Sequence, residues 1–124
     1  MLKTGKKILI VDDEKPMVRA LELKLGHAGF GVKSVFDGEE AMAELSKNKY
    51  DLILLDLIMP KKDGFVVLQE MKEKMIGTPV IALTNLGQKE DVKRAMEAGA
   101  KGYTIKSNTT LLEIVNQVRK ALGL

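Results

Sequence analysis

Short apolar runs alternate along the whole chain with longer stretches in which apolar residues recur at helical spacing. An unbroken apolar run of four or five residues is typical of a strand buried on both faces, whereas apolar residues three or four positions apart form one face of an amphipathic helix. The first unit shows both patterns, with the segment 7–11 followed by Val18, Leu21, Leu25 and Ala28. Four similar units follow, so the pattern predicts five strand–helix pairs.

Residues that begin or end helices lie between these units. Pro16 suits the first turn of the first helix, and Gly29 suits the left-handed position just past its end. Asp37 is placed to cap the second helix, with Glu40 three residues later, as in a capping box. Asp63 is a candidate cap for the third helix. These signals support the boundaries that the apolar pattern predicts.

Strands that are apolar on both faces and alternate with helices imply a parallel sheet covered on both sides. The fold class is therefore α/β, and the expected architecture is a flavodoxin-like doubly wound (βα)5 fold with a five-stranded parallel sheet in the order 2-1-3-4-5. The other predicted strands are 32–36, 51–55, 79–83 and 102–105. The apolar positions of the later helices are Ala41, Met42, Leu45, Phe65, Leu68, Met71, Met75, Val92, Ala95, Met96, Leu111, Val115, Val118 and Leu122.

Length and composition predict one globular domain that spans residues 1–124. With 45% apolar and 30% charged residues, the chain has enough apolar material to form a core. The absence of cysteine excludes disulfides, thiolate metal sites and thiol nucleophiles. The single histidine, His27, falls at a predicted helix end and is expected to be solvated, which argues against serine triads and histidine metal clusters.

The charge pattern favours neither nucleic acid nor membrane as a partner. The net charge of +3 is mild, and the lysines are interspersed with acidic residues. No apolar run approaches the roughly 20 residues that a membrane helix needs, and the N-terminus lacks the apolar core of a signal peptide. We therefore expect a cytoplasmic protein.

Polar residues with chemical potential lie where the predicted strands end. Asp12 and Asp13 end the first strand, Asp56 the third, Thr84 the fourth and Lys106 the fifth. In an open parallel sheet, binding and chemistry occur beyond the carboxyl ends of the strands, at the point where strand order reverses. In the order 2-1-3-4-5 the first and third strands are neighbours there. The three carboxylates are therefore expected to share one pocket.

A cluster of three carboxylates needs protons or a cation. Two carboxylates about 4 Å apart repel by about 4 kcal/mol at an effective dielectric constant near 20. Asp13 alone is equally well explained as a helix cap, but the set of three predicts a divalent ion, and oxygen ligands without histidine or cysteine favour Mg²⁺. An aspartate beside Mg²⁺ with Lys106 opposite suggests phosphoryl transfer. A carboxylate nucleophile is already deprotonated, so it needs no general base.

The motifs "VDDE", "LLDLIMPKKDG", "ALT" and "IK" occur in this order, each at a predicted strand end. With them the chain resembles the receiver domains of two-component response regulators over essentially its whole length. The resemblance implies that Asp56 accepts a phosphoryl group from a partner histidine kinase or histidine phosphotransfer protein. It also implies that Asp12, Asp13, Asp56 and the backbone carbonyl of Ile58 hold Mg²⁺, and that Lys106 pairs with the phosphoryl group.

The resemblance further implies a switch. In that family the hydroxyl at the position of Thr84 moves to a phosphoryl oxygen, and the aromatic residue at the position of Tyr103 turns inward. Phosphorylation would then alter the surface formed by the fourth helix, fifth strand and fifth helix. Such a chain catalyses its own aspartyl phosphorylation and dephosphorylation but is chiefly a signalling module. The downstream target or fused output domain, and a phosphorylation-dependent dimer, stay open.

Four residues depart from the family pattern or bear on its chemistry. Ser107 follows Lys106 where the family usually has a proline after a cis peptide bond, so this bond is expected to be trans or strained. Asn85 replaces a residue that is often small and is expected to crowd the pocket mouth or alter switching. Ile58 and Leu86 offer no polar group to orient an attacking water, which predicts a long-lived aspartyl phosphate.

Two other functions were compatible with parts of the sequence. An aspartate-nucleophile phosphatase also uses Mg²⁺, but its motif places a second aspartate two residues after the nucleophile, whereas Asp12 and Asp13 are adjacent. A phosphorylation-independent scaffold would explain the departures at Asn85 and Ser107. Loop residues Lys61 and Lys62 are expected to be solvated, the alternative being attraction of an anionic phosphodonor.

Overall fold

The computed structural model describes residues 3–124, so residues 1 and 2 of the predicted domain lie outside the described part. Five parallel strands form one sheet in the order β2-β1-β3-β4-β5, which confirms the predicted topology. The strands are β1 (Lys7–Val11), β2 (Gly31–Val35), β3 (Leu52–Leu55), β4 (Val80–Thr84) and β5 (Gly102–Ile105). The helices are α1 (Lys15–His27), α2 (Gly38–Lys47), α3 (Gly64–Glu73), α4 (Lys89–Glu97) and α5 (Leu111–Ala121), with a short 3-10 helix η1 (Lys106–Asn108) before α5.

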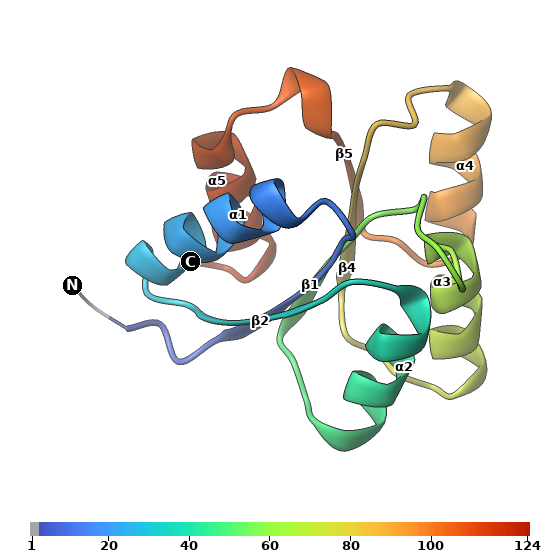
Figure 1. Ribbon diagram of the computed structural model, residues 1–124, viewed down its shortest axis with the longest axis horizontal. Helices are drawn as coiled ribbons and strands as arrows, with labels where there is room; N and C mark the ends of the chain where they lie inside the picture. The colour runs from blue at the N-terminus through green and yellow to red at the C-terminus, as the bar shows by residue number, and fades with distance from the viewer. Residues whose placement is uncertain (1–2) are drawn as a thin grey trace.

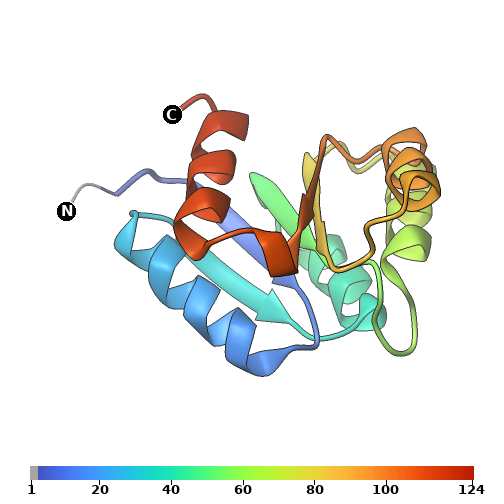
Figure 2. The ribbon, with the colours of Figure 1, turned by 90° about the horizontal axis from the view of Figure 1, so that it is seen from above.

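Helices cover both faces of the sheet. Helices α1 and α5 lie on one face, and α2, α3 and α4 lie on the other (Figures 1 and 2). Strand side chains alternate between two apolar cores: Ile8 and Ile10 of β1 pack under α1 and α5, while Leu9 and Val11 pack toward α2 and α3. The three central strands β1, β3 and β4 are therefore apolar on both faces, whereas the edge strand β2 carries Lys33 and Ser34.

The signals at helix ends are largely as predicted. Pro16 lies in the first turn of α1, and Gly29 takes the left-handed conformation past its end, with φ 97°. Asp37 Oδ1 accepts a hydrogen bond from Glu40 N–H at 2.8 Å. The Glu40 side chain accepts from Phe36 N–H rather than from the cap residue itself, so the predicted capping box is present in a modified form.

Two methionines differ from what the apolar spacing suggests. Met75 was predicted to continue the buried face of the third helix, but α3 ends at Glu73 and Met75 is 90% exposed, with φ 58°. The chain reverses there, and Ile76 packs against the core instead. Met96 on α4 is 43% exposed, and Ala95 is the buried residue of that helix.

Smaller differences concern boundaries. Strand β2 begins at Gly31 and β4 ends at Thr84, each one residue away from the predicted range. A full capping box begins α5, where Thr110 and Glu113 exchange hydrogen bonds that the sequence reading did not identify. Within residues 3–124, no helix combines the length and the apolarity needed to cross a membrane.

Candidate functional site

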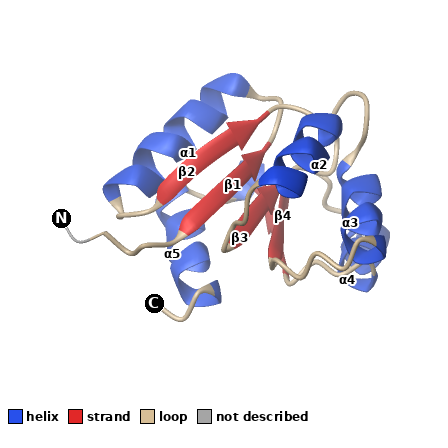
Figure 3. Cartoon of the chain, turned by 90° about the horizontal axis from the view of Figure 1, so that it is seen from below, coloured by secondary structure: helices blue, strands red, loops and turns tan. Residues whose placement is uncertain are grey.

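The candidate site lies at the carboxyl edge of the sheet, beyond the ends of β1, β3, β4 and β5. The arrows of β1, β3 and β4 point toward this edge in Figure 3. Residues 12 and 13 follow β1, and residue 56 follows β3, its direct neighbour in the sheet. The end of β4 supplies Thr84, and Lys106 comes directly after β5. The strand order therefore brings together residues that are up to 94 positions apart in the sequence.

Three carboxylates meet in this pocket. One oxygen from each of Asp12, Asp13 and Asp56 lies within 4.8 Å of the others, with Asp12 and Asp56 buried and Asp13 exposed. Among the described residues, Asp12 Oδ2 is the one buried side-chain polar atom without a hydrogen-bond partner of suitable geometry. Burial raises the pKa of the Asp12 carboxyl, although hydrogen bonds from Lys106 and Glu14 oppose this. The close charged partner of Asp12 Oδ2 is the Lys106 ammonium, 2.7 Å away. A buried carboxylate oxygen that meets a cation but makes no hydrogen bond fits a metal ligand.

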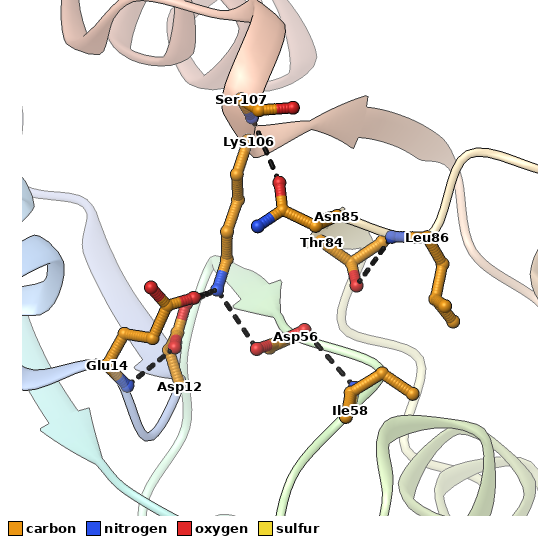
Figure 4. A network of polar contacts seen from close by, with 9 residues as sticks. All are labelled: Asp12, Glu14, Asp56, Ile58, Thr84, Asn85, Leu86, Lys106 and Ser107. Carbon is orange, nitrogen blue, oxygen red and sulfur yellow. Dashed lines mark hydrogen bonds and ion pairs between the residues drawn. The ribbon is translucent and has the colours of Figure 1, made fainter.

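The Lys106 ammonium is the positive charge in the pocket (Figure 4). Its Nζ lies 2.7 Å from Asp12 Oδ2, 2.6 Å from Glu14 Oε1 and 3.0 Å from Asp56 Oδ2, and its side chain is only 3% exposed. Burial alone would lower the pKa of Lys106, but the contacts with these three carboxylates outweigh it and raise the pKa above its ordinary value. Lys106 therefore stays charged at neutral pH.

Backbone contacts fix Asp56 at the tip of β3. Its N–H donates to Val11 O at 2.9 Å, and its Oδ1 accepts from Ile58 N–H at 3.2 Å. The Ile58 side chain is 58% exposed, so it leaves the pocket open on that side. One Asp56 oxygen thus faces a backbone amide and the other faces an ammonium.

The close packing around Gly64 explains why the "LLDLIMPKKDG" motif ends in a glycine. A Cβ at this position would lie 2.4 Å from Asp56 O and 2.7 Å from Leu57 Cα, both backbone atoms that cannot move aside cheaply. Helix α3 begins here, with Asp63 Oδ1 accepting from Val66 N–H at 2.9 Å as its predicted cap. The first turn of α3 is therefore packed directly against the backbone that carries Asp56.

Thr84 and Tyr103 flank the loop after β4. Thr84 is buried, and its hydroxyl oxygen accepts from Leu86 N–H at 3.5 Å, the long limit for such a bond. The half-buried Tyr103 donates its hydroxyl to Leu86 O at 2.6 Å. Both side chains thus contact one residue of this loop, and Tyr103 links it to β5 next to the surface of α4 and α5.

Sequence reasoning missed two features of the pocket. Glu14 belongs to the "VDDE" motif, yet only the structure shows that it pairs with Lys106. Asn85 lines the pocket, and its Oδ1 accepts a hydrogen bond from Ser107 N–H at 3.0 Å. No cis peptide bond occurs within residues 3–124, so the bond between Lys106 and Ser107 is trans. No sequence spacing pairs residue 85 with residue 107.

The remaining candidates have local partners. Lys62 Nζ lies 2.7 Å from Glu70 Oε2, and Lys61 Nζ lies 3.7 Å from Asp37 Oδ2. Both lysines therefore pair within the chain, although Lys61 is well exposed. His27 is exposed at the last position of α1, as expected for a solvated residue.

The comparison with protein families is decisive. The sequence model of the response regulator receiver domain matches residues 8–119. This chain belongs to the receiver-domain family. Receiver domains act in two-component signal transduction, generally bind Mg²⁺ at an acidic pocket and interact with histidine kinases or phosphotransfer proteins. In this chain, Asp12, Asp13 and Asp56 form an acidic cluster.

Two relatives of this receiver domain are transcriptional regulators by name. It is 38% identical over 102 residues to the alkaline phosphatase synthesis transcriptional regulatory protein PhoP of Bacillus subtilis, a match that covers 82% of this chain and 42% of that protein. It is 41% identical over 105 residues to the probable transcriptional regulator ycf27 of Guillardia theta, covering 85% of this chain and 41% of that protein. The receiver domain thus spans about two fifths of these relatives.

Solved structures support the same fold. The receiver domain of the Francisella response regulator 1452 superposes with a TM-score of 0.90 at 29% identity, covering 96% of this chain and 98% of that one. The phosphorylated cyanobacterial phytochrome response regulator RcpA superposes with a TM-score of 0.81 at 34% identity, covering 93% and 91% of the two chains. The flavodoxin-like architecture is therefore shared along nearly the full length.

Proposed function

We propose that residues 1–124 form a phosphoryl-accepting receiver module in which Asp56 is the acceptor. The observation that carries this proposal is the position of Asp56, which is buried at a strand tip beside two further carboxylates and has Lys106 Nζ 3.0 Å from its Oδ2. A capping or structural aspartate needs neither a lysine inside the pocket nor a second buried carboxylate. The phosphorylated state of the similar regulator RcpA supports the same chemistry.

The reaction needs little from the protein beyond placement and charge. A carboxylate oxygen of Asp56 attacks phosphorus, the phosphorus–nitrogen bond of the partner's phosphohistidine breaks, and the leaving imidazole takes a proton from solvent. Because the nucleophile carries no proton, no general base is required. Lys106 stays protonated and places its charge where negative charge gathers on the transferred group.

The residues of the pocket fit a magnesium ion. We propose that Asp12, Asp13, Asp56 and the backbone carbonyl of Ile58 hold it. One oxygen from each aspartate lies close to the others, and the buried Asp12 Oδ2 meets the Lys106 ammonium in an ion pair without hydrogen-bond geometry. When bound, Mg²⁺ neutralises charge on the phosphoryl oxygens. Lys106 cannot do this alone, because three carboxylates already share its ammonium.

Phosphorylation is proposed to act on the surface formed by α4, β5 and α5. The contacts of Thr84 and Tyr103 with Leu86 support this, because they connect the pocket to the loop that leads into α4. The module would then control a partner protein or a fused output domain, as the transcriptional regulators among its relatives suggest. The proposed setting is the cytoplasm, with a histidine kinase or histidine phosphotransfer protein as donor.

Intact mass spectrometry tests the acceptor directly. The protein is incubated with Mg²⁺ and a small-molecule phosphodonor such as acetyl phosphate, and the gain of one phosphoryl mass is expected. Asp56→Asn should abolish the adduct, while Asp51→Asn, a change of the same kind at the amino end of β3, should retain it. No adduct, or one that persists in Asp56→Asn, would favour a scaffold that works without phosphorylation.

A further inference from the structure

The two positions that depart from the receiver-domain pattern are joined by a hydrogen bond. Ser107 N–H donates to Asn85 Oδ1 at 3.0 Å, between the loop after β4 and the 3-10 helix after β5 (Figure 4). A proline at position 107 would have no N–H to donate, and a small apolar residue at position 85 would have no oxygen to accept it. The two departures therefore complement each other chemically.

The bond acts on the peptide unit that carries Lys106. This unit consists of the Lys106 carbonyl and the Ser107 N–H, and it is trans. Its carbonyl accepts from Thr109 N–H at 3.3 Å, while its N–H is bound by Asn85. Both polar groups of the unit are thus held, one from within η1 and the other from the loop after β4.

The direction of the Lys106 side chain depends on this peptide unit. The side chain extends into the pocket to reach Asp12, Glu14 and Asp56, with its Nζ 2.6–3.0 Å from their oxygens. The lysine ammonium sits on a flexible four-carbon chain. The position of the ammonium in the pocket therefore depends on how firmly the backbone at Lys106 is held. Asn85 and Ser107 are exposed, so removing their hydrogen bond should change the orientation of the Lys106 side chain without disrupting the apolar core.

We propose that Asn85 is a positioning residue for Lys106. Through the Ser107 N–H it holds the trans Lys106–Ser107 peptide in the orientation that directs the ammonium toward Asp56. The kinetic consequence rests on the proposed function. The orientation of Lys106 does not, since it can be measured in the unphosphorylated protein.

The test uses Asn85→Ala and two matched variants. Asn85→Asp keeps an acceptor oxygen, and Ser107→Ala removes a side chain while keeping the N–H. Amide hydrogen exchange at residue 107 and the NMR signals of the Lys106 side chain are measured without phosphodonor. Asn85→Ala should speed exchange about two- to tenfold, as expected for loss of one hydrogen bond, and shift the Lys106 signals. Both control variants should stay close to wild type.

The second measurement is the rate of Asp56 phosphorylation by acetyl phosphate with Mg²⁺. Asn85→Ala should lower the maximal rate about two- to tenfold with little change in the half-saturating phosphodonor concentration, because it misdirects a charge needed in the transition state. Ser107→Ala should phosphorylate at the wild-type rate. If Asn85 had a purely structural role, Asn85→Ala would lower the melting temperature. It would not lower the maximal rate selectively while leaving the half-saturating phosphodonor concentration unchanged.

The outcomes separate the two proposals. Unchanged exchange at residue 107 and unchanged Lys106 signals in Asn85→Ala would overturn the positioning role, whether or not Asp56 is phosphorylated. Equal effects of Asn85→Ala and Ser107→Ala would also overturn it, because the latter keeps the N–H. Shifted Lys106 signals in a protein that takes up no phosphoryl group would leave the positioning role intact and defeat the proposed function.

Discussion

At the scale of single residues, the pocket combines groups that are unfavourable separately. The burial that raises the pKa of Asp12 also means that its ionised form destabilises the fold. Lys106 compensates only in part, since its ammonium is shared with Glu14 and Asp56. Such a pocket gives up stability that a bound cation can restore.

Asp12→Asn should therefore weaken magnesium binding without lowering the free energy of unfolding of the magnesium-free protein. Without Mg²⁺ the variant is expected to unfold at a urea concentration equal to or above that of wild type, because a buried charge is removed. At a hundredfold excess of Mg²⁺ over its dissociation constant, wild type should gain about 2.7 kcal/mol in free energy of unfolding, and the variant should gain much less. Asp13→Asn provides the comparison. Because Asp13 is exposed, this substitution should change the free energy of unfolding little without Mg²⁺, but it should reduce the stabilisation that Mg²⁺ provides. Equal stabilisation of all three proteins by Mg²⁺ would contradict the proposed ligand set.

Ile58 leads to a prediction about the lifetime of the phosphorylated state. Its exposed side chain borders Asp56 and offers no group that could orient water, so the aspartyl phosphate is expected to persist. Ile58→Asn introduces an amide there and should speed loss of the phosphoryl group roughly tenfold. Ile58→Ala, which opens space without adding a polar group, should stay close to wild type. The decay of the phosphorylated mass after removal of phosphodonor measures all three, and equal decay rates would refute the explanation.

At the scale of elements, the packing of α3 against the end of β3 fixes the acceptor. Gly64→Ala places a Cβ 2.4 Å from Asp56 O, so the helix or the strand tip must shift. We expect a loss of about 1–3 kcal/mol in free energy of unfolding, measured with urea, together with slower phosphorylation of Asp56. Gly77→Ala is the matched control, because nothing lies within 4 Å of its added Cβ and the expected change is below about 0.5 kcal/mol. Equal effects of the two substitutions would show that the close approach is not limiting.

Strands and helices could be predicted from the sequence where the spacing of apolar residues follows one pattern throughout the segment. The apolar runs predicted the strands, most clearly β1, β3 and β4, which are buried on both faces. The strand order was predicted from the doubly wound pattern of alternating strands and helices, and the structure confirms it. The end of α3 was not predictable, since Met75 continues the apolar spacing but adopts a left-handed conformation usual for glycine. The same limit applies to the site. Carboxylates at strand ends could be foreseen from topology, but the bond between Asn85 and Ser107 depends on the shape of two loops.

At the scale of the whole molecule, the proposed switch requires a change at Asp56 to reach the surface formed by α4, β5 and α5 at one edge of the sheet. Leu86 is held at both polar backbone groups, weakly at its N–H by the Thr84 hydroxyl at 3.5 Å and firmly at its carbonyl by Tyr103 at 2.6 Å. The weak bond is the one that Thr84 can exchange for a phosphoryl oxygen at low cost. The loop that leads into α4 would then lose its tie to β4 while keeping its tie to β5.

Thr84→Ala should therefore uncouple phosphorylation from its distant effects. Amide NMR spectra with and without a beryllofluoride phosphoryl mimic are expected to show changes in wild type from the pocket through residues 85–88 to α4, β5 and α5. In Thr84→Ala the changes should stay within the pocket, because no hydroxyl links the phosphoryl group to the loop. Thr84→Ser keeps the hydroxyl and should restore the distant changes. Distant changes of wild-type extent in Thr84→Ala would mean that the signal leaves the pocket by another route, such as the Lys106 side chain and the peptide held by Asn85.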